Sequence, residues 1–325
     1  MTSDNPLLIT CVGVDHDIDM FPHFLRHYLT LGVRPESIHP LLNARHADAP
    51  GMAKAHAMLV QAGIPEGNAE IWIAPYTSDS MWKKRRELQK RLCGEQDWVI
   101  SADVDEFHFY PEPLTDFLAR CDALKVNCVQ GVFVDRLAEG GSLAEVREEP
   151  DLLEQFPIEA EVALSIAGRG EHHGLGGTVK IMAMRGYVMP NRGGHAPLKD
   201  QRVSLLYKRP LGRVSEVGSP DFRFSLPTRV AHIHWTSSLP ARLRERLATP
   251  GLTPAGLEYG QKQLDHLERH DGIALDQVAL APSDWPGNWE KRLSRLRFEA
   301  RKVALKGAIK SRISAVKRRV MGALS

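Results

Sequence analysis

The stretch from Asp97 to Pro111 reads DWVISADVDEFHFYP. It opens with apolar residues typical of a buried strand, and three carboxylates, Asp103, Asp105 and Glu106, follow closely. In an open parallel sheet, ligands bind beyond the carboxyl ends of the strands. Asp103 and Asp105 lie two positions apart, so their side chains project the same way on an extended chain. The stretch therefore predicts a buried strand that brings a dense group of negative charges to a ligand-binding edge.

Carboxylates this close together need a counterion, because each negative charge disfavours ionisation of the next. A hard divalent cation such as Mn²⁺ or Mg²⁺ binds carboxylate oxygens and would supply the opposite charge. An acidic loop that is simply solvated at the end of a strand is the alternative, since short acidic motifs are common. We expect Asp103 and Asp105 to bind a metal ion.

Strand-like and helix-like segments alternate before and into this stretch. The predicted strands cover residues 7–14, 38–42, 70–74 and 97–102, and the predicted helices cover 21–29, 52–61 and 78–93. Strands that alternate with helices of about 10 to 15 residues indicate a parallel sheet covered on both faces. We therefore expect an α/β fold with a doubly wound, mostly parallel sheet and helices on both faces.

The second half of the sequence is less regular. Its predicted strands cover 126–134 and the apolar part of 179–184, and its predicted helices cover 113–121, 240–248 and 254–270. Residues 136–157 form a charged loop or short helices, and the many Gly and Pro residues of 190–227 indicate loops. The Gly-rich stretch 168–177 contains no Walker loop, and we expect a mobile loop there that closes over a ligand.

Composition places the chain among ordinary soluble proteins. With 325 residues and 25% charged side chains, it is long enough to bury a core without disulfides. Its four cysteines are far apart and form no C-x-x-C pair, which favours free thiols in a reducing compartment. No apolar run approaches the roughly 20 residues of a membrane span, and no basic region precedes a signal-type segment. We expect a cytoplasmic protein.

The C-terminal segment carries a concentrated positive charge. Residues 291–325 contain 12 basic residues and one acid, which leaves 30 basic and 39 acidic residues in the first 290. Apolar residues recur there every three or four positions, which predicts a basic amphipathic helix. We expect it to lie on an anionic membrane at the inner face, although packing on the body is the alternative. Nucleic acid is disfavoured as a partner, because the segment's only aromatic residue is Phe298 and the body is acidic.

The string W-V-x-x-x-D-x-D-E-F, from Trp98 to Phe107, resembles the metal-binding motif of nucleotide-sugar glycosyltransferases with the GT-A fold, in the family 2-like group. The segment FPHFLRHYLTLGV from Phe21 to Val33 resembles the first helix of that group, and His27 and Gly32 match it.

Other positions match this group less closely. It usually has an Asn-Glu pair where this chain has His16 and Asp17. Later elements of the group resemble Lys180 in VKIMAM, His195 in RGGHAP and the stretch AHIHWTSS that begins at residue 231.

The resemblance implies an enzyme of hexosyltransferase type that moves a sugar from a nucleoside-diphosphate sugar to a hydroxyl acceptor. The acceptor would be a glycan or a lipid-linked molecule in surface polysaccharide or glycoconjugate assembly. The implied GT-A-like domain covers 1–270, with a nucleotide-sugar half over 1–110 and an acceptor half over 111–270. Residues 271–325 would form a C-terminal extension.

The same resemblance assigns roles to single residues. The ion would lie between Asp103, Asp105 and the diphosphate, where it stabilises the leaving group. Asp17, Asp103 and Lys180 are the implied nucleotide contacts. A histidine late in the fold often completes the metal site, and of His232 and His234 we favour His234, because an aromatic residue follows it as in the family.

Two further groups of residues are candidates on position alone. The run from Lys83 to Arg91 is basic, and we expect Lys83 and Arg86 to meet the diphosphate, although most cations on such a helix are solvated. Asp135 ends a predicted strand and is the first candidate for the catalytic base. An ion pair with Arg136 is the alternative role for this carboxylate.

Two other functions use the same features. A Mg²⁺-dependent nucleotidyltransferase would place the same aspartates on a similar sheet. A membrane-docked scaffold without catalysis would need only the body and the basic segment.

Overall fold

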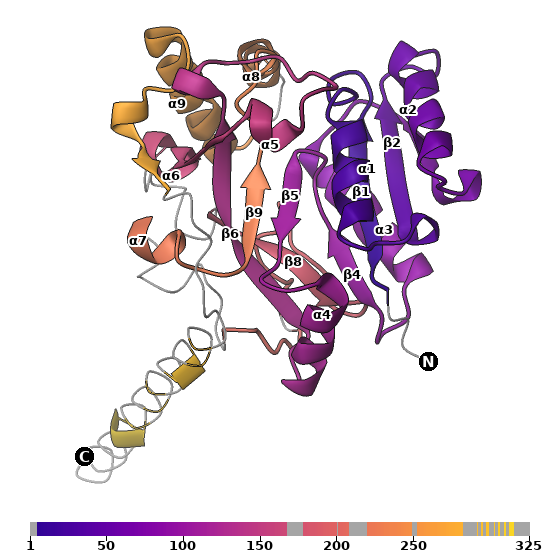
Figure 1. Ribbon diagram of the computed structural model, residues 1–325, viewed down its shortest axis with the longest axis vertical. Helices are drawn as coiled ribbons and strands as arrows, with labels where there is room; N and C mark the ends of the chain where they lie inside the picture. The colour runs from indigo at the N-terminus through magenta and orange to yellow at the C-terminus, as the bar shows by residue number, and fades with distance from the viewer. Residues whose placement is uncertain are drawn as a thin grey trace, which may run out of the picture.

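The computed structural model describes residues 5–167, 178–199, 201–207, 220–248 and 252–281, with single residues between 291 and 314. One mixed sheet runs through it, with helices packed against it (Figure 1). The α/β class expected from the sequence is confirmed. The Gly-rich stretch 168–177 lies outside the described residues, as does most of the basic segment.

The N-terminal half of the sheet is parallel. Its strands lie in the order β3-β2-β1-β4, and each neighbouring pair is parallel. The strands are β1 (Leu7–Gly13), β2 (Ile38–Ala44), β3 (Glu70–Ile73) and β4 (Trp98–Ser101). The helices between them are α1 (Phe21–Thr30), α2 (Pro50–Gln61) and α3 (Ser78–Leu92). Every one of these elements matches a predicted element to within a few residues.

Strand β1 is buried on both faces, and its alternate residues belong to different hydrophobic clusters. Leu8 and Val12 pack in the cluster that contains residues of α1 and α2, whereas Ile9 and Cys11 pack with residues of α3. A strand covered on both faces has no polar side, which explains the continuous apolar run in the sequence. Helices therefore cover both faces of this half of the sheet.

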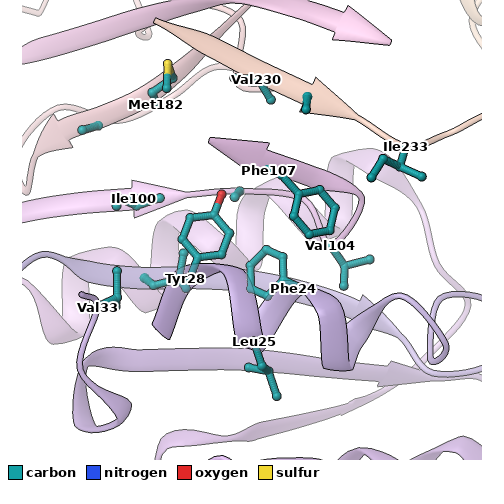
Figure 2. Close-up of a cluster of buried hydrophobic side chains, with 14 of the residues drawn as sticks. Phe24, Leu25, Tyr28, Val33, Ile100, Val104, Phe107, Met182, Val230 and Ile233 are labelled. Atoms are coloured by element: carbon teal, nitrogen blue, oxygen red, sulfur yellow. The ribbon is translucent and has the colours of Figure 1, made fainter. Parts of the chain in front are cut away.

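The larger cluster ties α1 to β5 (Glu106–Phe109), the strand that follows the acidic turn at residues 103–106 (Figure 2). The rings of Phe24 and Tyr28 lie with centroids 4.6 Å apart, and Phe107 belongs to the same cluster. The Tyr28 hydroxyl donates a hydrogen bond to the backbone carbonyl of Glu106 over 3.1 Å. Packing and this hydrogen bond together fix the position of the acidic turn relative to α1.

The C-terminal half of the sheet is mixed. Strand β8 (Val179–Arg185) pairs antiparallel with both β4 and β6 (Cys128–Leu137). Strand β5 (Glu106–Phe109) pairs antiparallel with β9 (Arg229–His232), which in turn runs parallel to β6. The sheet is completed by β7 (Ile158–Glu161) and β10 (Ala279–Leu280). The sequence prediction lacks β5, β7 and β10. Strand β10 has only two residues, and β5 (EFHF) and β7 (IEAE) lack the apolar runs that mark β3 and β4.

Helices α8 and α9 pack together beside the end of β6. The helices of this half are α4 (Leu114–Ala123), α5 (Leu152–Gln155), α6 (Val162–Ala167), α7 (Pro220–Arg223), α8 (Leu239–Leu247) and α9 (Pro254–His270). Leu137 of β6 packs in one cluster with Leu243 of α8 and Leu264 of α9. The helices within the described ranges are all too short or too polar to cross a lipid bilayer. All four cysteines are free thiols, as expected.

The basic segment is described only at single positions between residues 291 and 314. The side chains of Phe298, Leu305, Ile309 and Ile313 are exposed there. Arg297 donates a hydrogen bond to the backbone carbonyl of Leu206 over 2.8 Å. The start of the segment therefore contacts the body, while these four apolar side chains face solvent.

Candidate functional site

The acidic turn lies where the connections of the sheet reverse direction. From β1 the chain passes to β2 and β3 on one side, and β4 then lies on the other side of β1. Ligands of open α/β sheets bind beyond the strand ends at such a point. Asp103 follows β4, and Asp17 follows β1, with its backbone N–H donating to the carbonyl of Gly13 over 2.8 Å. Two of the predicted site residues thus lie at the same end of neighbouring strands.

The turn between β4 and β5 is closed by its own hydrogen bonds. The backbone N–H of Asp103 donates to Glu106 Oε2 over 3.2 Å, and that of Glu106 donates to the carbonyl of Asp103 over 3.0 Å. Antiparallel pairing then places Glu106 opposite His232, and the N–H of Ile233 donates to the carbonyl of Asp105 over 2.9 Å. Strand β9 therefore brings its histidines alongside the D-x-D residues.

Two buried cations hold the side chain of Asp103. Its Oδ1 accepts a hydrogen bond from Arg85, and its Oδ2 lies 2.9 Å from Lys180 Nζ. The same ammonium group lies 2.6 Å from Glu106 Oε1. Arg85, Lys180 and Glu106 are all buried. Asp103 thus belongs to a network of two acids and two bases at the strand end.

The network shifts the pKa values of its two acids in opposite directions. Burial opposes ionisation of Asp103, but Lys180 and Arg85 outweigh it and hold the pKa of this carboxyl well below its ordinary value. Burial and the nearby charge of Asp103 raise the pKa of Glu106 to about 7. Asp103 is therefore ionised at neutral pH, whereas Glu106 can gain or lose a proton there.

The side chain of Asp105 points to a different group of residues. Its Oδ2 lies 3.5 Å from Nε2 of His232 and 3.7 Å from Nδ1 of His234. The two imidazole rings are stacked, with centroids 5.0 Å apart and planes 12° apart. One ligand atom from each of the three residues can be chosen so that all lie within 4.8 Å of one another. These distances fit a single divalent ion, whose bonds to His nitrogen and carboxylate oxygen are about 2.0–2.2 Å.

The carboxylates around His232 strongly favour its protonated form when no metal ion is bound. Burial opposes the positive charge, but Asp105 and Asp135 outweigh it and raise the pKa of His232 to about 10. Burial and the charge of His232 lower the pKa of His234 to about 4, against the opposing hydrogen bond to Asp105. The pair therefore carries a single positive charge at neutral pH, which balances Asp105.

Asp135 contacts the ring nitrogen of His232 that does not face Asp105. Its Oδ1 accepts a hydrogen bond from His232 Nδ1 over 2.9 Å. Its Oδ2 accepts from the backbone N–H groups of Val162 and Ala163 over 3.1 and 3.2 Å, at the start of α6. The alternative partner, Arg136, pairs with Glu159 at 2.8 Å. Both oxygens of Asp135 are thus engaged, and this side chain is buried.

Asp17 lies near the site and is paired with α8. Arg242 Nη1 donates to Asp17 Oδ1 over 3.0 Å. Burial outweighs this ion pair and raises the pKa of Asp17 to about 6, with a further contribution from the charge of Asp105. Asp17 is therefore a carboxyl whose protonation changes just below neutral pH.

The two predicted cations of α3 contact groups outside this cluster of carboxylates. Lys83 is exposed and lies 4.0 Å from Glu87, and Arg86 donates to the backbone carbonyl of Pro190 over 3.3 Å. The cation of α3 that contacts the acidic turn is Arg85, which was not among the predicted site residues. The signal was present, because Arg85 is on the buried face of α3 with Trp82 and Leu88.

Comparisons with known proteins give loose similarities only. No family model matches the chain, and no curated protein matches it. Among solved structures, S. aureus TarS residues 1–349 is similar at 12% identity over 84% of this chain and 76% of that chain, with a TM-score of 0.32. The same TarS fragment in complex with UDP gives the same values. A longer TarS structure is 14% identical over 84% of this chain and 44% of that chain, with a TM-score of 0.30.

Proposed function

We propose that this chain is a metal-dependent glycosyltransferase that moves a sugar from a nucleoside-diphosphate sugar to a hydroxyl acceptor. The observation that carries the proposal is the convergence of Asp105, His232 and His234 at the strand ends beside Asp103. The D-x-D-E-F string and its preceding strand support the same conclusion by resemblance.

A divalent ion at Asp105 and the histidines would supply Lewis-acid stabilisation of negative charge on the departing diphosphate. The chain's own contribution is to hold these ligands rigidly. The β5–β9 pairing and the hydrogen bond from Ile233 to the Asp105 carbonyl fix their relative positions. Preorganised groups of this kind need not rearrange as charge develops, and this lowers the barrier.

The neighbouring residues would bind the nucleotide. Asp17 and Asp103 follow adjacent strands at the ligand-binding end of the sheet, and carboxylates accept hydrogen bonds from base N–H or ribose hydroxyl groups. Lys180 and Arg85 hold the turn through Asp103 and limit the net negative charge that an anionic donor would meet. We assign these residues to donor binding.

For the acceptor, we propose a glycan or lipid-linked molecule of surface polysaccharide assembly, reached by docking the basic segment on an anionic membrane. The support is the charge of residues 291–325, with 12 basic residues and one acid, and the exposure of Leu305, Ile309 and Ile313. These three positions are four residues apart and would lie on one side of a helix.

The test is hydrolysis or transfer by the full chain of a panel of nucleoside-diphosphate sugars in Mn²⁺. We expect turnover of at least one donor by the wild-type chain and a loss of about 100-fold or more in Asp105→Asn, since the carboxylate holds the ion. Asp116→Asn, on an exposed face of α4, is the matched control and should retain wild-type turnover.

Two results would contradict the proposal. Turnover that is equal in Asp105→Asn and the wild-type chain would remove the site from the reaction. Release of pyrophosphate from nucleoside triphosphates, with every sugar donor left intact, would indicate a nucleotidyltransferase instead.

A further inference from the structure

A cavity of about 130 Å³ lies on the opposite face of β6 and β9 from the candidate functional site. Successive side chains of a strand point to opposite faces of a sheet. Asp135 and His232 contact each other in the candidate site, whereas Arg136 and Arg229, at positions of the other face, line the cavity. We infer that this cavity binds a small monoanionic carboxylate with a short apolar tail.

This inference does not rest on the proposed function. Within the described part of the chain, the residues that line the cavity include none of the proposed metal ligands or donor-binding residues. Binding of a carboxylate in the cavity can also be measured without a sugar donor or a metal ion.

The charged end of the cavity holds two arginines around one glutamate. Glu159 Oε1 lies 2.8 Å from Arg136 Nη1, and Glu159 Oε2 lies 2.8 Å from Arg229 Nη1. Only 12% of the Arg136 side chain and 3% of the Arg229 side chain are exposed. Burial lowers the pKa of the Arg229 guanidinium, and the charge of Arg136 lowers it further, against the attraction of Glu159. The three side chains together carry one net positive charge.

The neighbouring charges leave this net charge in place. Glu161 pairs with Arg223 at 2.8 Å, so that pair is balanced by itself. The carboxylate of Asp151 attracts Arg136, but it is exposed and acts more weakly than Glu159. Because a buried charge without a counterion is costly, a bound monoanion would stabilise this end of the cavity.

The two guanidinium groups are suited to a carboxylate. Each is a planar fork of donors that can bind both oxygens of a carboxylate at once. Arg136 is held in place by the backbone, since its Nε donates to the carbonyl of Phe156 over 2.8 Å and its Nη2 to that of Leu153 over 3.0 Å. A side chain that is already fixed loses little freedom when a ligand binds.

The other end of the cavity is apolar. It is lined by Phe109, Val134, Leu153 and Ala231. The volume of about 130 Å³ is far larger than the roughly 10–15 Å³ that a single water molecule needs by this measure. A short hydrocarbon tail would fill this end, whereas the further oxygens of a phosphate would lie against apolar side chains without partners. A phosphate dianion would also exceed the single positive charge.

The experiment is isothermal titration calorimetry of the full chain with butyrate, butyramide and inorganic phosphate at low ionic strength. We expect butyrate to bind with a Kd of about 1 mM, the range of a ligand with six non-hydrogen atoms. Butyramide has the same shape without the charge and should bind at least about tenfold more weakly. Phosphate should also bind at least about tenfold more weakly than butyrate.

Two variants change the charge of the cavity in opposite directions. Arg136→Gln leaves one arginine with one glutamate and should weaken butyrate binding by about tenfold or more. Glu159→Gln raises the net positive charge and should tighten butyrate binding by about fivefold, which a general loss of structure cannot do. The matched control is Arg34→Gln, which removes an exposed arginine that lies 3.3 Å from Glu36 and should leave the affinity within about twofold.

Each variant is first checked for folding by near-UV circular dichroism. If Arg136→Gln does not fold, Arg136→Lys replaces it, because lysine keeps the charge but loses the paired donors, and it should weaken butyrate binding by about fivefold. Absence of butyrate binding to the wild-type chain would overturn the inference, as would equal affinity in Arg136→Gln or weaker binding in a folded Glu159→Gln. Tighter binding of phosphate than of butyrate would overturn the assignment of a carboxylate ligand.

Discussion

Replacement of Lys180 by methionine tests whether the buried charge network holds the acidic turn together. The Lys180 ammonium lies 2.9 Å from Asp103 Oδ2 and 2.6 Å from Glu106 Oε1. Methionine retains most of the apolar stem, so the substitution removes mainly the charge. Asp103 keeps its contact with Arg85, whereas among the described residues Lys180 is the only cation within ion-pair distance of Glu106.

The expected cost comes from the carboxyl group that is left behind. Breaking a buried ion pair costs about 3–5 kcal/mol, because the remaining charge is uncompensated. Glu106 can escape part of this cost by taking up a proton, since the pKa of its carboxyl is already about 7. We therefore expect a loss of about 3 kcal/mol at pH 8. With an unfolding entropy of about 2.1 cal/mol/K per residue, this loss lowers Tm by roughly 4 °C for a chain of 325 residues.

The loss should also depend on pH in a defined direction. The folded state holds the Glu106 proton more tightly than the unfolded chain, so stability falls as pH rises from the unfolded pKa to the folded pKa. Without Lys180 the folded pKa rises above its value of about 7, and the fall continues to higher pH. The difference in stability between Lys180→Met and the wild-type chain should therefore grow between pH 6 and pH 8.

The assay is urea unfolding of the full chain at pH 6 and pH 8. The matched control is Lys54→Met on the exposed side of α2, which should change stability by less than about 0.5 kcal/mol. Lys180→Met combined with Glu106→Gln should recover part of the loss, because the second change removes the uncompensated acid. Unchanged stability in Lys180→Met, or no recovery in the double variant, would show that Lys180 does not stabilise the acidic turn through Glu106.

Three further predictions concern Gly194, the ion pair of Asp17 and the basic segment. Gly194 has φ +68°, and a Cβ there would lie 2.7 Å from the Trp82 ring, so Gly194→Ala should lower the free energy of unfolding in urea by about 1–3 kcal/mol. The control is Gly67→Ala, where a Cβ has open space. Equal stability of the two variants would contradict this prediction. Arg242→Ala should raise the pKa of Asp17 above its value of about 6, because it removes a cation 3.0 Å from the carboxylate. A carboxyl ¹³C NMR titration measures this pKa, and an unchanged or lower value would contradict the ion pair. Deletion of residues 291–325 should abolish sedimentation with vesicles of two parts phosphatidylcholine and one part phosphatidylglycerol, at about 1 kcal/mol for each basic residue near the surface; continued sedimentation would rule out this docking.

Much of the N-terminal half could be predicted because local patterns there agree with the fold. Strand β1 is buried on both faces and reads as an apolar run, and α1 shows one apolar stripe that ends near Gly32. Strand β5 escaped prediction because its four residues follow the acidic turn at once. Its pairing with β9, from Phe109 opposite Arg229 to Glu106 opposite His232, joins residues 120 to 126 positions apart, and no local pattern encodes such a contact.

The residues of the candidate site could be chosen from the sequence, whereas the contacts that each of them makes could not. Asp105, His234 and His232, the alternative to His234, lie together in the folded chain. The separation of Asp103 from Asp105 depends on Arg85 and Lys180, which lie on α3 and β8 and meet only in the folded chain. Arg85 could have been found, since it lies at a buried position of an amphipathic helix. The sequence also contained no sign that one oxygen of Asp135 accepts hydrogen bonds from the backbone of α6, which is distant along the chain.

The most direct measurement of the central claim is anomalous diffraction at the manganese edge, from crystals of the full chain grown with Mn²⁺ and UDP, GDP, CDP or ADP. We expect one strong peak within about 2.0–2.3 Å of an Asp105 oxygen and of nitrogens of His232 and His234, with a diphosphate oxygen on the same ion. A map without a peak there, while the nucleotide is bound elsewhere, would contradict the proposed metal site.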